Sequence, residues 1–300
     1  MRIRLFTYNA RYLVVLIFAL LSIFVSAQEP EKMHSTMFGA GTNNVLDSYL
    51  SPYNYNGLDI RIMHENMRRT KQTEGHLFHQ SLLDINGSFL SNKSKSAKEY
   101  TVGARFSYAW LYNFRQKSNP STPSNPSNPS NPSNPSNLPT SPFGGWGASP
   151  PLSGWSAFIG LQPSIYIGGI YNTRNGNNPA QAKVDLMLNA TARATYGLRL
   201  KDKVLPISYQ LTVPLLGIAY SPNYGQSYYE EFLLNHYDHN VCFAHIANMP
   251  SMRHLLTLDI PIRKNFLRIG WSGEFNQAKL NGIKYHSYAN NFLIGYCVFK

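Results

Sequence analysis

Two long stretches of the sequence alternate regularly between apolar and polar residues. Over residues 100–115 the even positions, from Tyr100 to Phe114, are all apolar or aromatic, while the odd positions are mostly polar or small. Residues 184–200 repeat the pattern, with no charged residue on the apolar face. Successive side chains of a β-strand point to opposite faces, so each stretch predicts a strand with one apolar face. Strands in soluble sheets usually have about 5–6 residues. The length seen here is typical of a strand that crosses a membrane at a tilt.

Eight further segments show the same alternation, some of them weakly. These segments are 33–41, 56–68, 76–90, 155–171, 205–219, 252–262, 267–276 and 284–299. A membrane sheet must close, because lipid does not tolerate the unpaired backbone of an open edge. The fold class predicted is therefore all-β, a transmembrane antiparallel up-and-down β-barrel. Bacterial barrels have even strand numbers, so we expect ten strands. Twelve remain possible if further strands lie near 241–247.

Residues 1–27 have the features of a secretory signal peptide. Three arginines precede a short apolar run at 13–25, and small residues lead up to Ala27, where we expect cleavage. The apolar run is shorter than the about 20 residues that a spanning helix needs. The expected domains are the signal peptide and an outer-membrane barrel over residues 28–300. We therefore expect the protein in the outer membrane of a Gram-negative bacterium, with membrane lipid and the barrel-insertion machinery as partners.

The composition agrees with an exported membrane barrel. The chain holds 20 Tyr, 16 Phe and 4 Trp but only 14% charged residues, which suits the aromatic girdles of such barrels. The net charge of +12 would allow nucleic-acid binding. The basic residues are scattered singly and the chain carries an export signal, so no nucleic-acid partner is expected. Cys242 and Cys297 are predicted to lie at opposite ends of the barrel, too far apart for a disulfide.

Residues 116–153 form a long connection of low complexity. Within it a proline recurs at every third position, which matches the three-residue turn of polyproline II. Proline lacks the amide donor that a sheet ladder needs, so this segment is predicted to be a disordered insert. Short and long connections otherwise alternate along the chain, as expected for periplasmic turns and outer loops. Counting strands from either terminus places the insert on the periplasmic side.

Charged residues fall on the face predicted to point into the barrel. The proposed lumen network consists of Arg105, Asp185, Arg193, Arg199, Arg253, Asp259, Arg268 and Glu274, and Asp59, Arg61, Glu65, Asp84 and Arg115 share the inward face. Such charges either line a selective pore or pair with one another to fill a narrow barrel. Acidic and basic groups are nearly balanced, and buried charges need partners. We therefore favour a filled lumen.

The loop at 220–250 contains the weak catalytic candidates His236, Asp238 and His239. Imidazole and carboxylate groups can bind zinc, and a histidine beside Ser221 or Ser227 could support a lipid hydrolase. The spacing matches no strong catalytic or metal-binding motif. A folded loop that satisfies its own backbone is the simpler interpretation, so no metal and no cofactor are expected.

Five short motifs occur in a characteristic order along the chain. They are NVLDSYLSP at 44–52, NNPAQA at 177–182, SPNYGQSY at 221–228, YDHN at 237–240 and LLTLD at 255–259. Together they resemble a Bacteroidetes outer-membrane β-barrel family filed as domain of unknown function 3316. The resemblance spans about residues 33–299, and the proline-rich segment looks like an insertion relative to the family. It implies a barrel in the cell envelope and brings no catalytic residues.

Three functional hypotheses remain from the sequence. The leading one is a non-enzymatic barrel with a largely filled lumen, structural or slowly permeable to small solutes. The alternatives are a lipid-acting hydrolase that uses the 221–240 loop and a surface-binding module that uses the outer loops. Whether the lumen is open or filled separates the first hypothesis from a pore.

Overall fold

The computed structural model describes residues 32–70, 76–114, 155–200, 203–262 and 265–299. The predicted signal peptide, Arg115 and the predicted insert at 116–153 lie outside these residues. The strands are β1 (Lys32–Asp47), β2 (Tyr55–Arg69), β3 (Leu77–Asn92), β4 (Lys98–Asn113), β5 (Trp155–Asn172), β6 (Ala180–Leu200), β7 (Lys203–Tyr220), β8 (Val241–His245), β9 (Ser251–Ile262), β10 (Asn265–Leu280) and β11 (Ile283–Phe299), and one short helix, α2 (Tyr228–Phe232), lies between β7 and β8.

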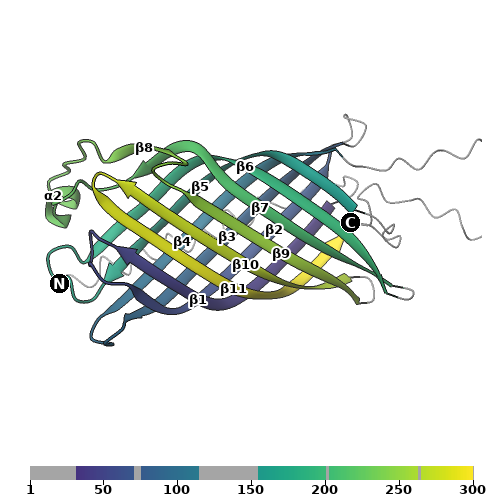
Figure 1. Ribbon diagram of the computed structural model, residues 1–300, viewed down its shortest axis with the longest axis horizontal. Coiled ribbons are helices and arrows are strands. Elements are labelled where there is room, and N and C mark those ends of the chain that lie inside the picture. Colours follow the sequence, from purple (N-terminus) through teal and green to yellow (C-terminus); the bar gives the residue numbers. More distant parts are fainter. Residues whose placement is uncertain (1–31, 71–75, 115–154, 201–202, 263–264, 300) are drawn as a thin grey trace, which may run out of the picture. The chain divides into compact units, whose positions relative to one another are not determined.

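Ten of these strands close into an antiparallel barrel (Figure 1). Neighbouring strands in the chain pair in order from β1 to β7, then β7 pairs with β9, β9 with β10 and β10 with β11. The ring closes where β1 pairs with β11, with Met33 opposite Phe299. β8 pairs only with the end of β7 and adds no position to the ring. The ten-strand prediction is therefore confirmed, and the twelve-strand alternative is not needed.

The two ends of the barrel differ in what they carry. Lys32 and Phe299, the first and last residues of the ring, lie at one end, which we call the terminal end. Asn113 and Trp155, which flank the insert, belong to that end as well, because β4 finishes there and β5 starts there. The opposite end, called the loop end, carries α2 and β8 (Figure 1). The strand count that placed the insert beside the chain termini thus agrees with the topology.

Side chains alternate between the outside and the lumen along each strand. On β4, Phe106 and Trp110 are 38% and 45% exposed, whereas Arg105 and Ser107 are buried. Outward apolar side chains continue around the ring, with Ile62 on β2 and Ile165 on β5 as examples. An apolar surface that surrounds a closed sheet on its outside suits contact with lipid rather than water. Among the described residues, no helix is both long and apolar enough to cross a bilayer.

β1 is longer than the sequence pattern indicated. The alternation predicted a weak strand at 33–41 with a long loop from 42, yet β1 runs to Asp47. Polar residues occupy both faces here, because Asn43 points inward to Ser88 and Asn44 points outward to Asn56 and His286. A strand that is polar on both faces shows no alternation of hydropathy, so its end could not be recognised.

The barrel interior is layered from one end to the other. An apolar cluster fills the terminal end and consists of Met33, Met67, Phe78, Ala109, Leu111, Phe158 and Cys297, all at most 6% exposed. A second apolar cluster, which includes Val45, Tyr49, Tyr55 and Leu90, lies at the loop end. Polar and charged side chains occupy the barrel between these clusters, and they form the candidate site.

Candidate functional site

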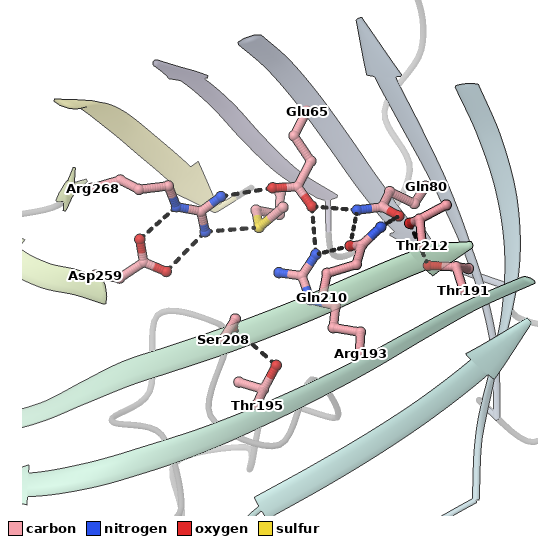
Figure 2. Close-up of polar contacts among 11 residues, drawn as sticks. Glu65, Gln80, Thr191, Arg193, Thr195, Ser208, Gln210, Thr212, Asp259 and Arg268 are labelled. Carbon is pink, nitrogen blue, oxygen red and sulfur yellow. Dashed lines mark hydrogen bonds and ion pairs between the residues drawn. The ribbon is translucent and has the colours of Figure 1, made fainter. Parts of the chain in front are cut away.

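The first charged layer lies next to the apolar cluster of the terminal end and is shown in Figure 2. Arg268 of β10 donates two hydrogen bonds to the carboxylate of Asp259, with Nε 2.6 Å from Oδ1 and Nη2 2.8 Å from Oδ2. Its third guanidinium nitrogen, Nη1, lies 2.8 Å from Oε2 of Glu65. The other oxygen of Glu65, Oε1, lies 2.5 Å from Nη1 of Arg193. Each carboxylate is therefore held by an arginine, as buried charges require.

Two glutamines extend this layer across the barrel. Gln80 Nε2 donates to Glu65 Oε1 over 2.6 Å and to Gln210 Oε1 over 2.8 Å, and Gln210 Nε2 donates back over 3.1 Å. We call Glu65, Gln80, Arg193, Gln210, Asp259 and Arg268 the terminal network. The Gln80–Gln210 contact joins β3 to β7, which are four positions apart in the ring of ten. The terminal network thus crosses the lumen, and its members are all at most 4% exposed.

A second charged layer lies nearer the loop end and is called the central network. Arg61 of β2 lies 3.1 Å from Asp84 and 2.7 Å from Glu274. Arg105 of β4 lies 3.2 Å from Asp185 and 3.6 Å from Glu274. β4 and β10 are five positions apart in the ring, which places them on opposite sides of the barrel. Arginine and carboxylate side chains therefore bridge the lumen at this level too.

Arg253 belongs to the same level but is not paired in the same way. It faces Glu274 across the β9–β10 ladder and Thr212 across the β7–β9 ladder. The Glu274 carboxylate already accepts from Arg61 and from Asn276 and lies beside Arg105. Nη2 of Arg253 is buried, and it has no hydrogen-bond partner among the described residues. A buried donor without an acceptor is costly, so this nitrogen is a place where a ligand oxygen would be stabilised.

A chamber opens between the central network and the loop end. The centre of a water-sized sphere can occupy about 70 Å³ of it, and about 10–15 Å³ of such space holds one water. Arg61, Arg105, Asp185 and Glu274 line one side of the chamber, and Tyr166, Lys183 and Tyr285 are among its other lining residues. Its size suits several waters or part of one small ligand.

Aromatic rings and cations are stacked in the chamber wall. The guanidinium carbon of Arg105 lies 4.6 Å from the ring centre of Tyr166, and Nζ of Lys183 lies 4.0 Å from that of Tyr285. Lys183 Nζ also lies 2.7 Å from Oδ2 of Asp47. These contacts fix the cations in place. Gly103 leaves room for Tyr166, because a Cβ added there would come within 2.2 Å of its hydroxyl oxygen.

Loops close over the loop end of the barrel. Ser227 caps α2 and exchanges hydrogen bonds with Glu230 in a capping box. Glu231 accepts hydrogen bonds from the hydroxyl groups of Tyr220 and Tyr49, the latter over 3.4 Å. Tyr228 N donates to Asn178 Oδ1 over 2.8 Å, which ties the helix to a second loop. We call this assembly of loops the loop cap.

The predicted lumen residues are placed as follows. Arg105, Asp185, Arg193, Asp259, Arg268 and Glu274 are buried, in one of the two networks, and Arg253 is half-buried beside the central network. Arg199 is exposed near the end of β6, and the described residues form no ion pair with it. The prediction that Arg199 joins the network is therefore not supported, because the strand end at this position is open to solvent.

The loop candidates His236, Asp238 and His239 are exposed. Their backbone carbonyls accept hydrogen bonds from Gln226, Asn223 and Asn281. Ser227 is held by the capping box, and Ser221 Oγ donates to the Pro222 carbonyl. No described contact joins either serine to a histidine side chain. Among the described residues, no group of three His, Cys, Asp or Glu side chains is arranged to hold a metal ion.

Several residues of the site were not predicted from the sequence. Asp47 lay in the loop predicted at 42–54, Lys183 lay just before the strand predicted at 184–200, and Tyr166 and Tyr285 were not distinguished from outward aromatics. Gln80 and Gln210 carry no charge and were not considered as partners. Extending the alternation of residues 184–200 by one residue would have placed Lys183 on the inward face, since it shares the odd positions of Asp185.

A family model described as "Protein of unknown function (DUF3316)" matches residues 12–121 and 158–298. The match leaves out residues 122–157, which include most of the proline-rich segment, as expected for an insertion. No curated protein matches the sequence significantly.

The cysteines, predicted to be unpaired, are both free thiols.

Several solved barrels align with most of the chain but only loosely. The translocator domain of autotransporter NalP from Neisseria meningitidis has 9% identity and a TM-score of 0.35, with 96% of this chain and 95% of that chain covered. The transport unit of the autotransporter AIDA-I from Escherichia coli has 8% identity and a TM-score of 0.37, with 92% and 94% covered. An outer membrane channel from Pseudomonas putida F1 has 7% identity and a TM-score of 0.34, with 92% and 97% covered.

Proposed function

Because the chain belongs to the DUF3316 family, whose description assigns no activity, we propose a role from the barrel itself. It is an outer-membrane barrel whose lumen is closed to ion flow, and its chamber binds a small ligand. The predicted signal peptide and the apolar outward surface support the location. The observation that best supports a closed lumen is the terminal network, which crosses the barrel next to a buried apolar cluster.

The charged side chains of the terminal network pair with one another, so none of them is left to attract a passing solute. Its two arginines and two carboxylates balance, and Glu65, Asp259 and Arg268 are each 0% exposed. A water-filled pore keeps its charged side chains hydrated, whereas these charges have exchanged water for one another. Phe78 and Phe158 pack edge to face in the apolar cluster next to the network, with ring centres 5.2 Å apart. This half of the barrel is therefore a plug made from its own strands.

The chamber supports a binding role rather than passage. It lies on the loop-end side of the plug and is lined by cations, carboxylates and tyrosines. Such a mixture of aromatic walls and a few placed polar groups is typical of ligand sites. With the plug intact, a ligand that enters the chamber has no route through the terminal end.

Conductance across a planar lipid bilayer tests the closed lumen. We expect no regular current steps from the refolded wild-type protein. Because both networks bridge the lumen, the matched variant relaxes both. It removes the Glu65–Arg193 pair and Phe78 at the terminal end (Glu65→Ala, Arg193→Ala, Phe78→Ala) and the Arg105–Glu274 contact of the central network (Arg105→Ala, Glu274→Ala), and it leaves the Arg268–Asp259 pair in place. This variant should conduct if it still folds, which its heat-modifiable migration in gels would show.

The control is Ile165→Ala, an outward-facing change on β5 that should stay silent. Regular conductance steps from the wild type would contradict the proposal. The hydrolase alternative is checked on the same preparation with phospholipid and lipopolysaccharide substrates. Turnover that disappears in His236→Ala or His239→Ala would favour that alternative.

A further inference from the structure

The wall of the barrel is interrupted between β7 and β9. β7 pairs with β9 over residues 207–212 and with β8 over residues 216–220. Residues 213–215 lie between these two ladders and have no partner in either. On the other side of the interruption, β8 turns into β9 through residues 246–250, where Met249 N bonds back to His245 O. β8 and β9 are thus two parts of one wall strand, joined by a turn.

The β6 side of the same stretch is irregular as well. The β6–β7 register shifts between Leu188 and Asn189, so that Leu215 is an extra residue in β7. Leu215 and Leu216 consequently both point outward, at 40% and 48% exposure. Pro214, beside them, has no amide hydrogen to donate. A bulge on the β6 side of β7 and a gap between ladders on its other side fall at the same level, and both weaken the pairing of β7 there.

Backbone groups without partners are not tolerated against lipid unless they line a cavity. A small cavity lies at this interruption, with Pro214, Met249, Met252 and Arg253 in its lining. Met252 is an outward side chain, 37% exposed, whereas Arg253 belongs to the lumen. The lining therefore includes both faces of the wall. This cavity shares Arg105, Asp185, Met249 and Asn276 with the chamber.

The two sides of the interruption differ in chemistry. On the outside, Leu215, Leu216, Ile218 and Met252 form an apolar rim. On the inside, Arg253 lines the same cavity, and its buried Nη2 has no hydrogen-bond partner among the described residues. A molecule that spans the interruption would meet apolar side chains at one end and a hydrogen-bond donor at the other.

We propose that the interruption between β7 and β9 is a lateral portal, through which a single-chain lipid amphiphile passes from the bilayer into the chamber. Its acyl chain lies along Met249 and Met252, which are flexible enough to move aside. Its head group accepts a hydrogen bond from Arg253 Nη2. This inference rests on the proposed function, since it names the ligand and the entrance of the chamber.

The charge around Arg253 decides the kind of head group. Three arginines and four carboxylates lie at this level of the lumen. The arginines are Arg61, Arg105 and Arg253, and the carboxylates are Asp59, Asp84, Asp185 and Glu274. An anionic head group would therefore gain no net attraction at this level. An uncharged head rich in oxygen fits the free donor without adding charge. A monoacylglycerol has this chemistry, whereas a fatty acid does not.

Binding of 1-oleoylglycerol to the full-length protein in phosphatidylcholine nanodiscs tests the portal. A diazirine on the acyl chain allows the bound molecule to be crosslinked and mapped by peptide mass spectrometry. We expect saturable binding, with crosslinks concentrated at residues 249–253. Oleate should bind more weakly. Preference for oleate, or crosslinks spread evenly around the barrel, would overturn the proposal.

Two matched variants sharpen the test. Met252→Trp fills the portal and should lower binding by about tenfold or more, a loss comparable to a well-made contact. Leu256→Trp is its control, because Leu256 lies outward on the same strand at 40% exposure but in the paired part of β9. Equal binding by the two tryptophan variants would count against the portal.

Arg253→Met tests the head group, since it removes a donor that has no described partner. It should weaken the binding of 1-oleoylglycerol by about tenfold or more, the contribution of a hydrogen bond to a charged group, and heat-modifiable migration in gels checks that the variant folds. Unchanged affinity in a folded Arg253→Met variant would refute the assigned donor. Conductance by the wild type would contradict the closed lumen but not the portal. Absence of 1-oleoylglycerol binding by a barrel that does not conduct would contradict the portal but not the closed lumen.

Discussion

Arg105 and Glu274 lie 3.6 Å apart although their strands, β4 and β10, stand on opposite sides of the ring. Arg61 of β2 pairs with Glu274, and Asp185 of β6 pairs with Arg105, so ion pairs link all four side chains. The lumen is therefore narrow enough for side chains to meet across it. This width distinguishes the barrel from wide pores, whose centre is filled with water.

Removing one member of the central network should destabilise the barrel strongly. Glu274→Gln leaves Arg61 and Arg105 without their shared carboxylate. Loss of one buried partner costs about 3–5 kcal/mol, and we expect a fall of that size in the free energy of unfolding. Urea titration of the protein in lipid vesicles, followed by tryptophan fluorescence, measures it.

Asp59→Asn is the matched comparison for Glu274→Gln. Asp59 is also buried but accepts hydrogen bonds from neutral groups, Ser88 and Asn291, and its Oδ2 is 3.9 Å from Nε of Arg61. The fall in the free energy of unfolding should be clearly smaller for Asp59→Asn than for Glu274→Gln. Equal losses for the two variants would show that the cross-barrel ion pairs contribute no more than hydrogen bonds to neutral side chains.

A charge placed on the outside of β4 should disturb insertion into the membrane. Phe106 is an outward residue at 38% exposure, between Ala104 and Tyr108 on the lipid-facing side of the strand. Phe106→Arg should cost about 2–4 kcal/mol if the position lies near the bilayer midplane. The folded fraction in vesicles of increasing lipid content measures it. Phe106→Leu should fold like the wild type, and equal behaviour of the two variants would contradict the assigned lipid face.

The loop cap should pack more stably on the loop end of the barrel at lower pH. Burial raises the pKa of Glu231, although the hydrogen bond from Tyr49 lowers it in part. Burial also raises the pKa of Tyr49 well above its ordinary value, so its hydroxyl keeps its proton. An acid whose folded pKa is raised stabilises the docked loop below its unfolded pKa, about 4.3. That contribution is lost as the pH rises through the folded pKa.

Hydrogen exchange of amides in residues 227–240, corrected for intrinsic rates, checks this at pH 5 and pH 8. Protection should be greater at pH 5, and Glu231→Gln should remove the difference. Glu230 supplies a control of opposite sign, because its hydrogen bonds with Ser227 lower its pKa. Its contribution is lost only as the pH falls through that lowered value. A loop cap equally protected at both pH values in the wild type would argue against the role of Glu231.

The proline-rich insert should be reached only from the periplasm. Its flanks, Asn113 and Trp155, lie at the terminal end, and barrels inserted from the periplasm leave their termini there. An epitope inserted between Asn128 and Pro129 should be labelled by antibody only after the outer membrane is permeabilised. A second epitope, in the loop cap between Tyr237 and Asp238, should be labelled on intact cells. The reverse labelling pattern would show that the terminal end faces the outside of the cell.

The alternation of apolar and polar residues sufficed to predict ten strands and the face of most charges. It worked because the barrel has a polar inside and an apolar outside, so each strand repeats one rule. Asp47 was missed because β1 becomes polar on both faces near the loop end, and Lys183 was missed because the predicted strand began one residue after it. Arg199 was misplaced because the rule does not say where a strand leaves the barrel.

The partners of each charge could not be derived in the same way. Glu65 meets Arg193 and Arg268, and only the closed ring brings these three strands together. The interruption at Pro214 was equally hidden, because residues 205–219 read as one continuous strand. A bulge is a property of how two strands pair, and a single sequence carries little trace of the pairing.

The terminal network also bears on how the barrel is assembled. Glu65 is separated in sequence by 128 residues from Arg193 and by 203 from Arg268. A sheet made only of β1 to β5 therefore presents this carboxylate without either arginine, and one that stops at β7 supplies only the first. Every sheet that contains β2 and stops before β10 therefore holds Glu65 without its full set of partners. The set of partners of Glu65 is complete only once β10 has joined, so the order in which the strands are added decides how long this carboxylate lacks one or both arginines.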